Sequence, residues 1–158
     1  MHLSFLDYLR TGELPPILFG TPRAEVLRQM GTPTSWVSKD DPLFQPPRRD
    51  RDYHVSDSFS YGSITLSFDA QDVVESTMIA LCLECAYPPG SLFFPEPTTL
   101  ICDVAELMRG QSIQFEDTSE HGDGSCLRTS SGVDIVANKE GRILSCHSKR
   151  PEYVLPVA

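Results

Sequence analysis

The chain has no long apolar segment and no basic leader. No run of eighteen apolar residues occurs among its 158 residues, so no transmembrane helix is predicted. The stretch after Met1 lacks the basic residues that open a secretory signal, and Asp7 interrupts its apolar run. We therefore expect a soluble, cytoplasmic protein.

Basic residues are also in the minority. The chain carries 13 lysines and arginines against 22 aspartates and glutamates, which gives a net charge of −9. Binding to nucleic acid needs a basic surface, so nucleic acid is not an expected partner. The charge favours a basic protein partner, because complementary charges steer encounter, although acidity can also serve solubility alone.

The five cysteines do not suggest a disulfide framework, because their number is odd and the expected location is reducing. We expect most of them to be buried as small apolar side chains. Cys82 and Cys85 form one Cys-x-x-Cys pair, which is half of a zinc site at most, or a redox motif. The residues that could complete a metal site lack a matching spacing: Cys126, Cys146, His121 and His147.

Motifs of known catalytic sites are missing as well. The sequence contains no Walker A, Gly-x-Gly-x-x-Gly, Gly-x-Ser-x-Gly or His-Glu-x-x-His pattern. Cys146 and His147 are adjacent, and neighbouring residues of a strand point to opposite faces, so they are not expected to form a nucleophile and base pair. We predict a protein that is not an enzyme and holds no cofactor and no metal, with metal binding by Cys82 and Cys85 left open.

The pattern of apolar residues predicts an α+β fold in one domain, 1–158. Period-two alternation in segment 58–68 indicates strand structure with a turn or bulge at Gly62, where the phase shifts. Thr21 and Pro22 are typical of a helix start, with Thr21 as N-cap and Pro22 at the first helical position. Helices are expected at 3–10, 21–30 and 98–109, and further strands at 36–38, 73–83, 112–115, 126–129, 133–137 and 142–147.

The order of these elements occurs twice. Segment 64–69 matches segment 133–138 at a constant offset of 69 residues, and the first long helix matches the second, with Val26 on Val104. The half-repeats would be 17–86 and 98–148, joined by a proline-rich linker at 87–97. We predict a tandem duplication of a helix, strand and meander unit, the alternative being chance similarity between amphipathic elements.

Joining the two halves predicts an antiparallel sheet with helices packed on one face. The other face would carry small polar side chains, namely Ser63, Thr65 and Ser67 in the first half and Asp134 and Val136 in the second. We expect such a face to be a docking surface for another protein.

Two polar loops, 39–52 and 116–124, supply further candidates for partner binding. Their acids would meet a basic partner, and three aromatic residues nearby would act as anchors. The alternative is that both loops are simply solvated. The candidate partner-binding residues are Trp36, Asp40, Asp41, Phe44, Asp50, Asp52, Tyr53, Glu116, Asp117, Glu120 and Asp123.

Two phrases carry a resemblance to known families. The segment 21–33, a helix ended by Gly31-Thr32-Pro33, resembles the helix of small tandem modules of the outer-membrane assembly lipoprotein and β-lactamase-inhibitor types. The segment 61–68, Tyr-Gly-Ser-Ile-Thr-Leu-Ser-Phe, resembles a phrase of immunity proteins of bacterial toxin systems. The lipoprotein type needs a lipidated cysteine near its start, which this chain lacks, so the immunity type is favoured.

The resemblance implies a protein that neutralises a cognate toxin or enzyme by binding it directly. The partner would be a basic toxin domain, with neither nucleic acid nor membrane involved. Two alternatives stay open: a small metal-dependent enzyme that uses the cysteines and histidines, and an adaptor subunit with no inhibitory role.

Overall fold

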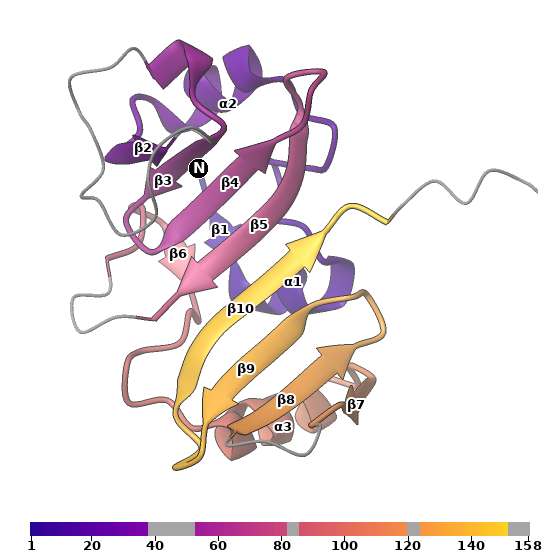
Figure 1. Ribbon diagram of the computed structural model, residues 1–158. Helices are drawn as coiled ribbons and strands as arrows, with labels where there is room; N and C mark the ends of the chain where they lie inside the picture. Colours follow the sequence, from indigo (N-terminus) through magenta and orange to yellow (C-terminus); the bar gives the residue numbers. More distant parts are fainter. Residues whose placement is uncertain (38–52, 82–85, 120–123, 152–158) are drawn as a thin grey trace, which may run out of the picture.

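The computed structural model describes residues 1–37, 53–81, 86–119 and 124–151, and it confirms an α+β fold (Figure 1). Its main feature is an eight-stranded antiparallel sheet in the order β2-β3-β4-β5-β10-β9-β8-β7. The strands are β2 (Ser35–Val37), β3 (Ser58–Tyr61), β4 (Ile64–Phe68), β5 (Val74–Ala80), β7 (Phe115–Asp117), β8 (Gly124–Thr129), β9 (Asp134–Asn138) and β10 (Ile143–Lys149).

Three helices lie on one face of this sheet (Figure 1). They are α1 (Phe5–Thr11), α2 (Arg23–Met30) and α3 (Ile101–Gly110), and a short 3-10 turn, η1 (Tyr53–Val55), precedes β3. In the described part of the chain, none of these helices has the length and hydropathy that a membrane span requires.

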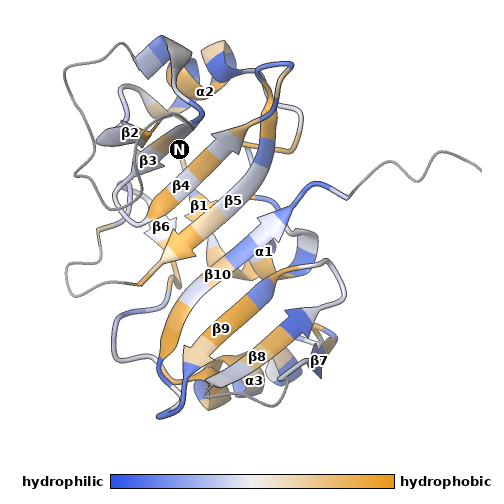
Figure 2. Cartoon of the chain, in the orientation of Figure 1, coloured by the Kyte–Doolittle hydropathy of each residue, from blue (hydrophilic) through white to orange (hydrophobic). Residues whose placement is uncertain are grey.

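The core fills the space between the helices and the sheet. Alternate strand residues are buried, as in β4, where Ile64, Leu66 and Phe68 are buried and the residues between them are not. The same alternation gives the banded colouring of the strands in Figure 2. The period-two pattern of the sequence therefore selects the face that meets the helices.

The two halves of the sheet have the same topology. Each begins with a helix and continues as a four-stranded meander, α2-β2-β3-β4-β5 and α3-β7-β8-β9-β10. They meet where β5 pairs with β10, and there Met78 lies opposite His147. These two residues occupy equivalent positions of the halves, so the joint has a local two-fold relation. An origin by duplication stays a prediction.

The likeness extends to single hydrogen bonds in the hairpins that precede β5 and β10. Asp69 Oδ1 accepts the N–H groups of Gln71 and Val73 at 2.9 and 3.3 Å. Asn138 Oδ1 accepts those of Glu140 and Arg142 at 3.1 and 2.9 Å. Aspartate and asparagine both provide this turn, because each offers a short side-chain oxygen to the backbone.

A bulge follows each of these hairpins. Phe68 pairs with Val74 and Ser67 with Ser76, which leaves Glu75 as the extra residue of β5. In β10 the extra residue is Leu144, at the equivalent position. Such a bulge bends the strand and increases its twist, so both halves curve over their helices at corresponding points.

Helix α1 belongs to neither half-repeat and packs beneath the joint. The Tyr8 hydroxyl donates to the Thr77 carbonyl of β5 at 3.4 Å, and Ser148 Oγ of β10 donates to the Gly12 carbonyl at 2.6 Å. Ser131 Oγ, in the β8–β9 turn, donates to the Leu9 carbonyl at 2.8 Å. The N-terminal segment therefore ties the two halves together through buried polar contacts.

The helix starts differ from the prediction. Pro22 is the N-cap of α2 and the helix begins at Arg23, whereas Thr21 was expected as the cap. Thr21 Oγ1 instead accepts the Leu18 N–H at 3.0 Å, and the equivalent Thr99 accepts the Glu96 N–H at 2.9 Å. Both threonines stabilise the turn before the helix, so neither is free to cap it.

Two other segments were predicted wrongly. The linker 87–97 contains a short strand, β6 (Ser91–Leu92), which pairs in parallel with β1 (Leu3–Ser4). Because residues 3 and 4 belong to β1, α1 begins at Phe5 and not at residue 3, where the helix was expected to begin. Strand β7 begins at Phe115 rather than 112, because Ser112 has a left-handed φ of 55° that no strand adopts.

Candidate functional site

The candidate site is the face of the eight-stranded sheet that faces away from the helices, called here the open face. No described helix or strand covers it, and Figure 1 looks onto it directly. It carries the strand residues that alternate with the buried ones. Thr65, Ser67, Asp134 and Val136 lie on it, as expected. Ser63 does not, because it is buried in the β3–β4 turn, where its Oγ accepts the Ala86 N–H at 3.2 Å.

A single row of residues crosses the open face from one edge of the sheet to the other. Strand pairing places each member beside the next, and we call this set the cross-strand row. In order, it consists of Ser35, Ser60, Thr65, Met78, His147, Asp134, Arg128 and Glu116.

The two ends of the row differ in chemistry. In the first half Ser60 Oγ and Thr65 Oγ1 share a hydrogen bond of 2.9 Å between short hydroxyl side chains. In the second half Arg128 binds Asp134 through two hydrogen bonds of 2.6 and 2.9 Å. Its hydrogen bond and charge attraction to Asp134 raise the pKa of Arg128. The row therefore joins a neutral hydroxyl surface to a fixed, paired-charge surface.

Met78 and His147 stand at the centre of the row. Met78 is 41% exposed and His147 is exposed as well. A methionine side chain adapts to irregular surfaces, because it is unbranched and polarisable. The centre of the open face thus offers an apolar contact flanked on both sides by polar groups.

The predicted partner-binding residues lie at the two far edges of the sheet. Trp36 of β2 packs edge-on against Tyr53 at 5.4 Å between ring centroids, and both are partly buried against the core. Glu116 and Asp117 are exposed on β7, at the opposite edge. The sheet thus separates the two groups instead of bringing them together. The remaining candidates lie outside the described residues: Asp40, Asp41, Phe44, Asp50, Asp52, Glu120 and Asp123.

The described cysteines and histidines do not converge. Cys146 is buried on the helix side, and burial raises the pKa of its thiol to about 12. It stays protonated near neutral pH, and His147 faces the other way, as predicted. Cys126 lies on the open face and is separated from Cys146 by β9, so these two cysteines, named above as residues that could complete a metal site, do not come together. Cys82, Cys85 and His121 lie outside the described residues.

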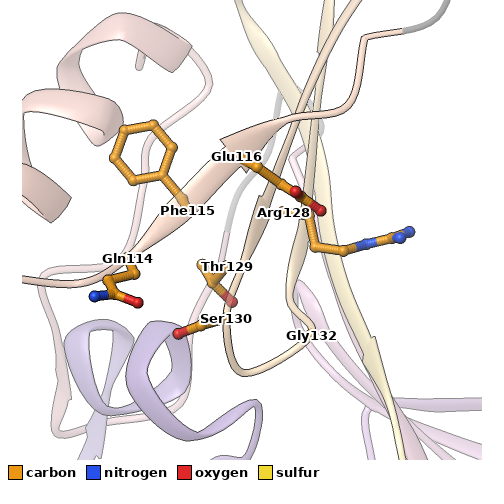
Figure 3. A pocket seen from close by; sticks show the side chains of 7 residues that line it. All are labelled: Gln114, Phe115, Glu116, Arg128, Thr129, Ser130 and Gly132. Atoms are coloured by element: carbon orange, nitrogen blue, oxygen red, sulfur yellow. The ribbon is translucent and has the colours of Figure 1, made fainter.

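No metal-binding group is found within residues 1–37, 53–81, 86–119 and 124–151, where three or more histidine, cysteine or acidic side chains never gather closely enough. A cavity of about 420 Å³ lies at the β7 edge (Figure 3). In it Gln114, Thr129 and Ser130 lie near one another, whereas Glu116 and Arg128 point to the other side of the sheet. The side chains that gather in this cavity are therefore uncharged, and the charged end of the cross-strand row lies on the opposite side of the sheet.

Sequence reasoning did not find the cross-strand row. The alternation of residues indicated which side chains share a face within one strand, but a row also needs the pairing register between strands. Register depends on turn lengths and bulges such as those at Glu75 and Leu144. The repeated offset between the halves was the one signal from which the register at the joint could have been derived.

Comparison with known proteins adds no relative. A scan against protein-family models, a search of curated proteins and a search of solved structures each found no match for the chain. The resemblance to immunity proteins therefore stays a prediction.

Proposed function

We propose that this chain is an inhibitor of the immunity type, which neutralises a cognate toxin or enzyme in the bacterial cytoplasm by binding it directly. The open face of the sheet would be the surface that meets the partner. One observation carries this proposal: an eight-stranded sheet has all its described helices on one side, and a continuous polar row with an exposed methionine at its centre on the other.

The dimensions of the face suit a protein partner. Eight strands at a spacing of about 4.8 Å span roughly 34 Å, which is enough for a protein interface of ordinary size. Four of the eight side chains of the row are short, namely Ser35, Ser60, Thr65 and Asp134, so ordering these four on binding costs little conformational entropy. Paired charges such as Arg128 and Asp134 are held in place before the partner arrives, which favours specificity.

The charge of the chain supports a basic partner. The net charge of −9 would speed the approach of such a protein, and Glu116 extends this charge to the β7 edge of the face. Charge and row have separate roles in this proposal: the charge steers encounter, and the row supplies close contact.

The test is growth rescue with a binding measurement. The chain would be co-expressed with the toxin-type protein encoded beside its gene, and Met78→Arg would be compared with Cys102→Arg. Both positions are exposed and both changes add one positive charge, but Cys102 lies on α3, away from the open face. We expect rescue by the wild type and by Cys102→Arg, and at least about tenfold weaker binding by Met78→Arg.

Two outcomes would contradict the proposal. Failure of the wild type to rescue growth from any neighbouring toxin would remove the inhibitory role and favour an adaptor. Full rescue by Met78→Arg, with unchanged affinity, would remove the open face from the interface.

A further inference from the structure

Phe93 has the most exposed side chain among the large apolar residues that the structure describes. It is 72% exposed, and its neighbour Leu92 is 46% exposed. Phe93 also has a left-handed φ of 60°, which is unfavourable for a bulky side chain. An aromatic ring is thus exposed on a strained backbone among the described residues, and an exposed apolar group of this kind is typical of an interaction site.

The segment that carries Phe93 is a rigid part of the fold. The Tyr87 hydroxyl donates to the Pro95 carbonyl at 2.7 Å, and the Tyr87 ring packs on the Phe94 ring with 4.8 Å between the ring centroids. The Phe94 ring in turn packs against Phe5 of the core, with 5.7 Å between the ring centroids. The exposed ring of Phe93 therefore projects from a fixed base.

Residues 86–89 of this segment also line a cavity of about 270 Å³, together with residues from the end of α2 and from the β3–β4 turn. The hydroxyl of Tyr61 donates to the Gly31 carbonyl at 3.0 Å, and that of Tyr87 donates to the Pro95 carbonyl, so the two rings and the prolines offer apolar surface to the cavity beside its threonines. A benzene molecule fits an apolar cavity of about 150 Å³, so a phenyl ring fits here. The lining residues are Met30, Thr32, Thr34, Tyr61, Gly62, Ala86, Tyr87, Pro88 and Pro89.

We propose that two copies of the chain associate through this segment, each placing Phe93 in the cavity of the other. Residues 86–89 of the cavity lining precede Phe93 by a few positions, and the turn at 88–91 connects the two. Its Ser91 donates to the Pro88 carbonyl from both its N–H and its Oγ, at 3.2 and 2.7 Å. A two-fold axis then uses ring and cavity twice, as a symmetric dimer requires.

Local charge allows a second copy to approach this segment. Glu96 is the only charged residue between positions 86 and 100, although the whole chain has a net charge of −9. The contact itself is apolar and the repulsion is long-range, so added salt strengthens the association by screening the repulsion. A lipid surface is a poorer occupant, because membrane-bound apolar segments are usually flanked by lysine and arginine.

The dimer is weak. Each buried phenylalanine removes roughly 150–250 Å² from water, and the whole contact stays below the area of a standard interface. We expect a dissociation constant on the order of 10⁻⁵ to 10⁻⁴ M. This association is independent of the proposed inhibitory function, which uses the open face.

The experiment is sedimentation velocity of the full chain at about 10 and about 500 μM, a range that brackets the expected constant. The wild type should be mainly monomeric at the lower concentration and mainly dimeric at the higher one. Phe93→Ser should weaken the dimer at least tenfold. Leu144→Ser is the matched control, because Leu144 is an exposed aliphatic residue on β10, 48% exposed, and its loss should leave association unchanged.

A second variant tests the cavity. Thr32→Lys places a charge at its exposed rim and should also abolish the dimer. A mixture of Phe93→Ser and Thr32→Lys should give a weaker heterodimer, because one intact ring can enter one intact cavity. A wild type that stays monomeric at both concentrations would overturn the proposal. So would association of either single variant at wild-type strength, with circular dichroism confirming that each variant is folded.

Discussion

In the first half of the molecule aromatic rings build the layer between sheet and helix, whereas in the second half aliphatic side chains do. Phe59 meets Phe68 edge-on at 4.9 Å between ring centroids. The equivalent pair in the second half is Leu127 and Ala137, both buried. The halves nevertheless share strand order, hairpin hydrogen bonds and bulge positions. The same backbone arrangement therefore accommodates two different sets of core side chains, provided that the alternation of buried and exposed residues and the turns are kept.

Arg23 gives the sharpest contrast between the halves. Its side chain is only 9% exposed, and its guanidinium lies 4.3 Å from the centroid of the Phe68 ring. It also donates to Asp72 Oδ1 at 2.7 Å and to the Tyr53 carbonyl at 3.2 Å. The equivalent residue of α3 is Ile101, beside the smaller aliphatic layer. The wider aromatic layer of the first half thus accommodates a cation that its counterpart replaces with an apolar side chain.

The largest expected effect comes from breaking the aromatic layer. Phe59→Ala removes a fully buried ring that contacts Tyr53, Tyr61 and Phe68, so we expect a loss of about 4 kcal/mol in the free energy of unfolding. The equivalent Leu127→Ala should cost about 2 kcal/mol, because the side chain is smaller and at the margin of the core. Urea unfolding measures both. Equal losses would show that the two layers bear the same share of stability.

The second-largest loss of stability is expected from glycine substitutions in the β3–β4 and β8–β9 hairpin turns. Gly62 has a φ of 62°, and an added Cβ would collide with the Ala86 carbonyl oxygen. Gly132 also has a positive φ, of 88°, but an added Cβ there would meet open space. We expect Gly132→Ala to cost about 1 kcal/mol for backbone strain, and Gly62→Ala about 3 kcal/mol because the Ala86 backbone must also move. Urea midpoints would contradict this if Gly132→Ala were the more harmful change.

The smallest effect distinguishes Asp69 from its counterpart Asn138. Desolvation pushes the pKa of Asp69 up, but the N–H groups of Val73 and Gln71 and the charge of Arg150 outweigh it, so the pKa is lowered. Asp69→Asn keeps the acceptor that Asn138 uses and loses only the ion pair of 2.9 Å with Arg150. At neutral pH we expect this change to destabilise the fold less than the changes in the aromatic layer and in the hairpin turns.

The pH dependence of that variant has a definite sign. A carboxyl group with a lowered pKa stabilises the fold above its unfolded pKa of about 4, and this contribution is lost as pH falls through the folded pKa. The stability difference between wild type and Asp69→Asn should therefore be constant from pH 7 to 5 and shrink towards pH 3. Urea unfolding at these three values checks it, and a difference that grows on acidification would contradict the assignment.

Local signals in the sequence predicted much of the fold. The alternation in segment 58–68 gave β3 and β4, with the turn at Gly62 where the phase changes. The match of segment 64–69 with 133–138 indicated the equivalent hairpins, in which Asp69 and Asn138 accept corresponding hydrogen bonds. The pairing of β1 with β6 could not be predicted, because two-residue strands have no period and their partners lie far apart in the chain.

The sequence by itself determined the class of elements, their order and the faces that they bury, because hydrophobic periodicity and turn residues act over a few neighbouring positions. Only the tertiary structure decided which residues meet across strands. It placed Met78 beside His147 at the joint, and it separated Trp36 from Asp117 by the full width of the sheet. The physical reason is that register and pairing depend on contacts between distant segments, and these contacts form only when the whole core closes.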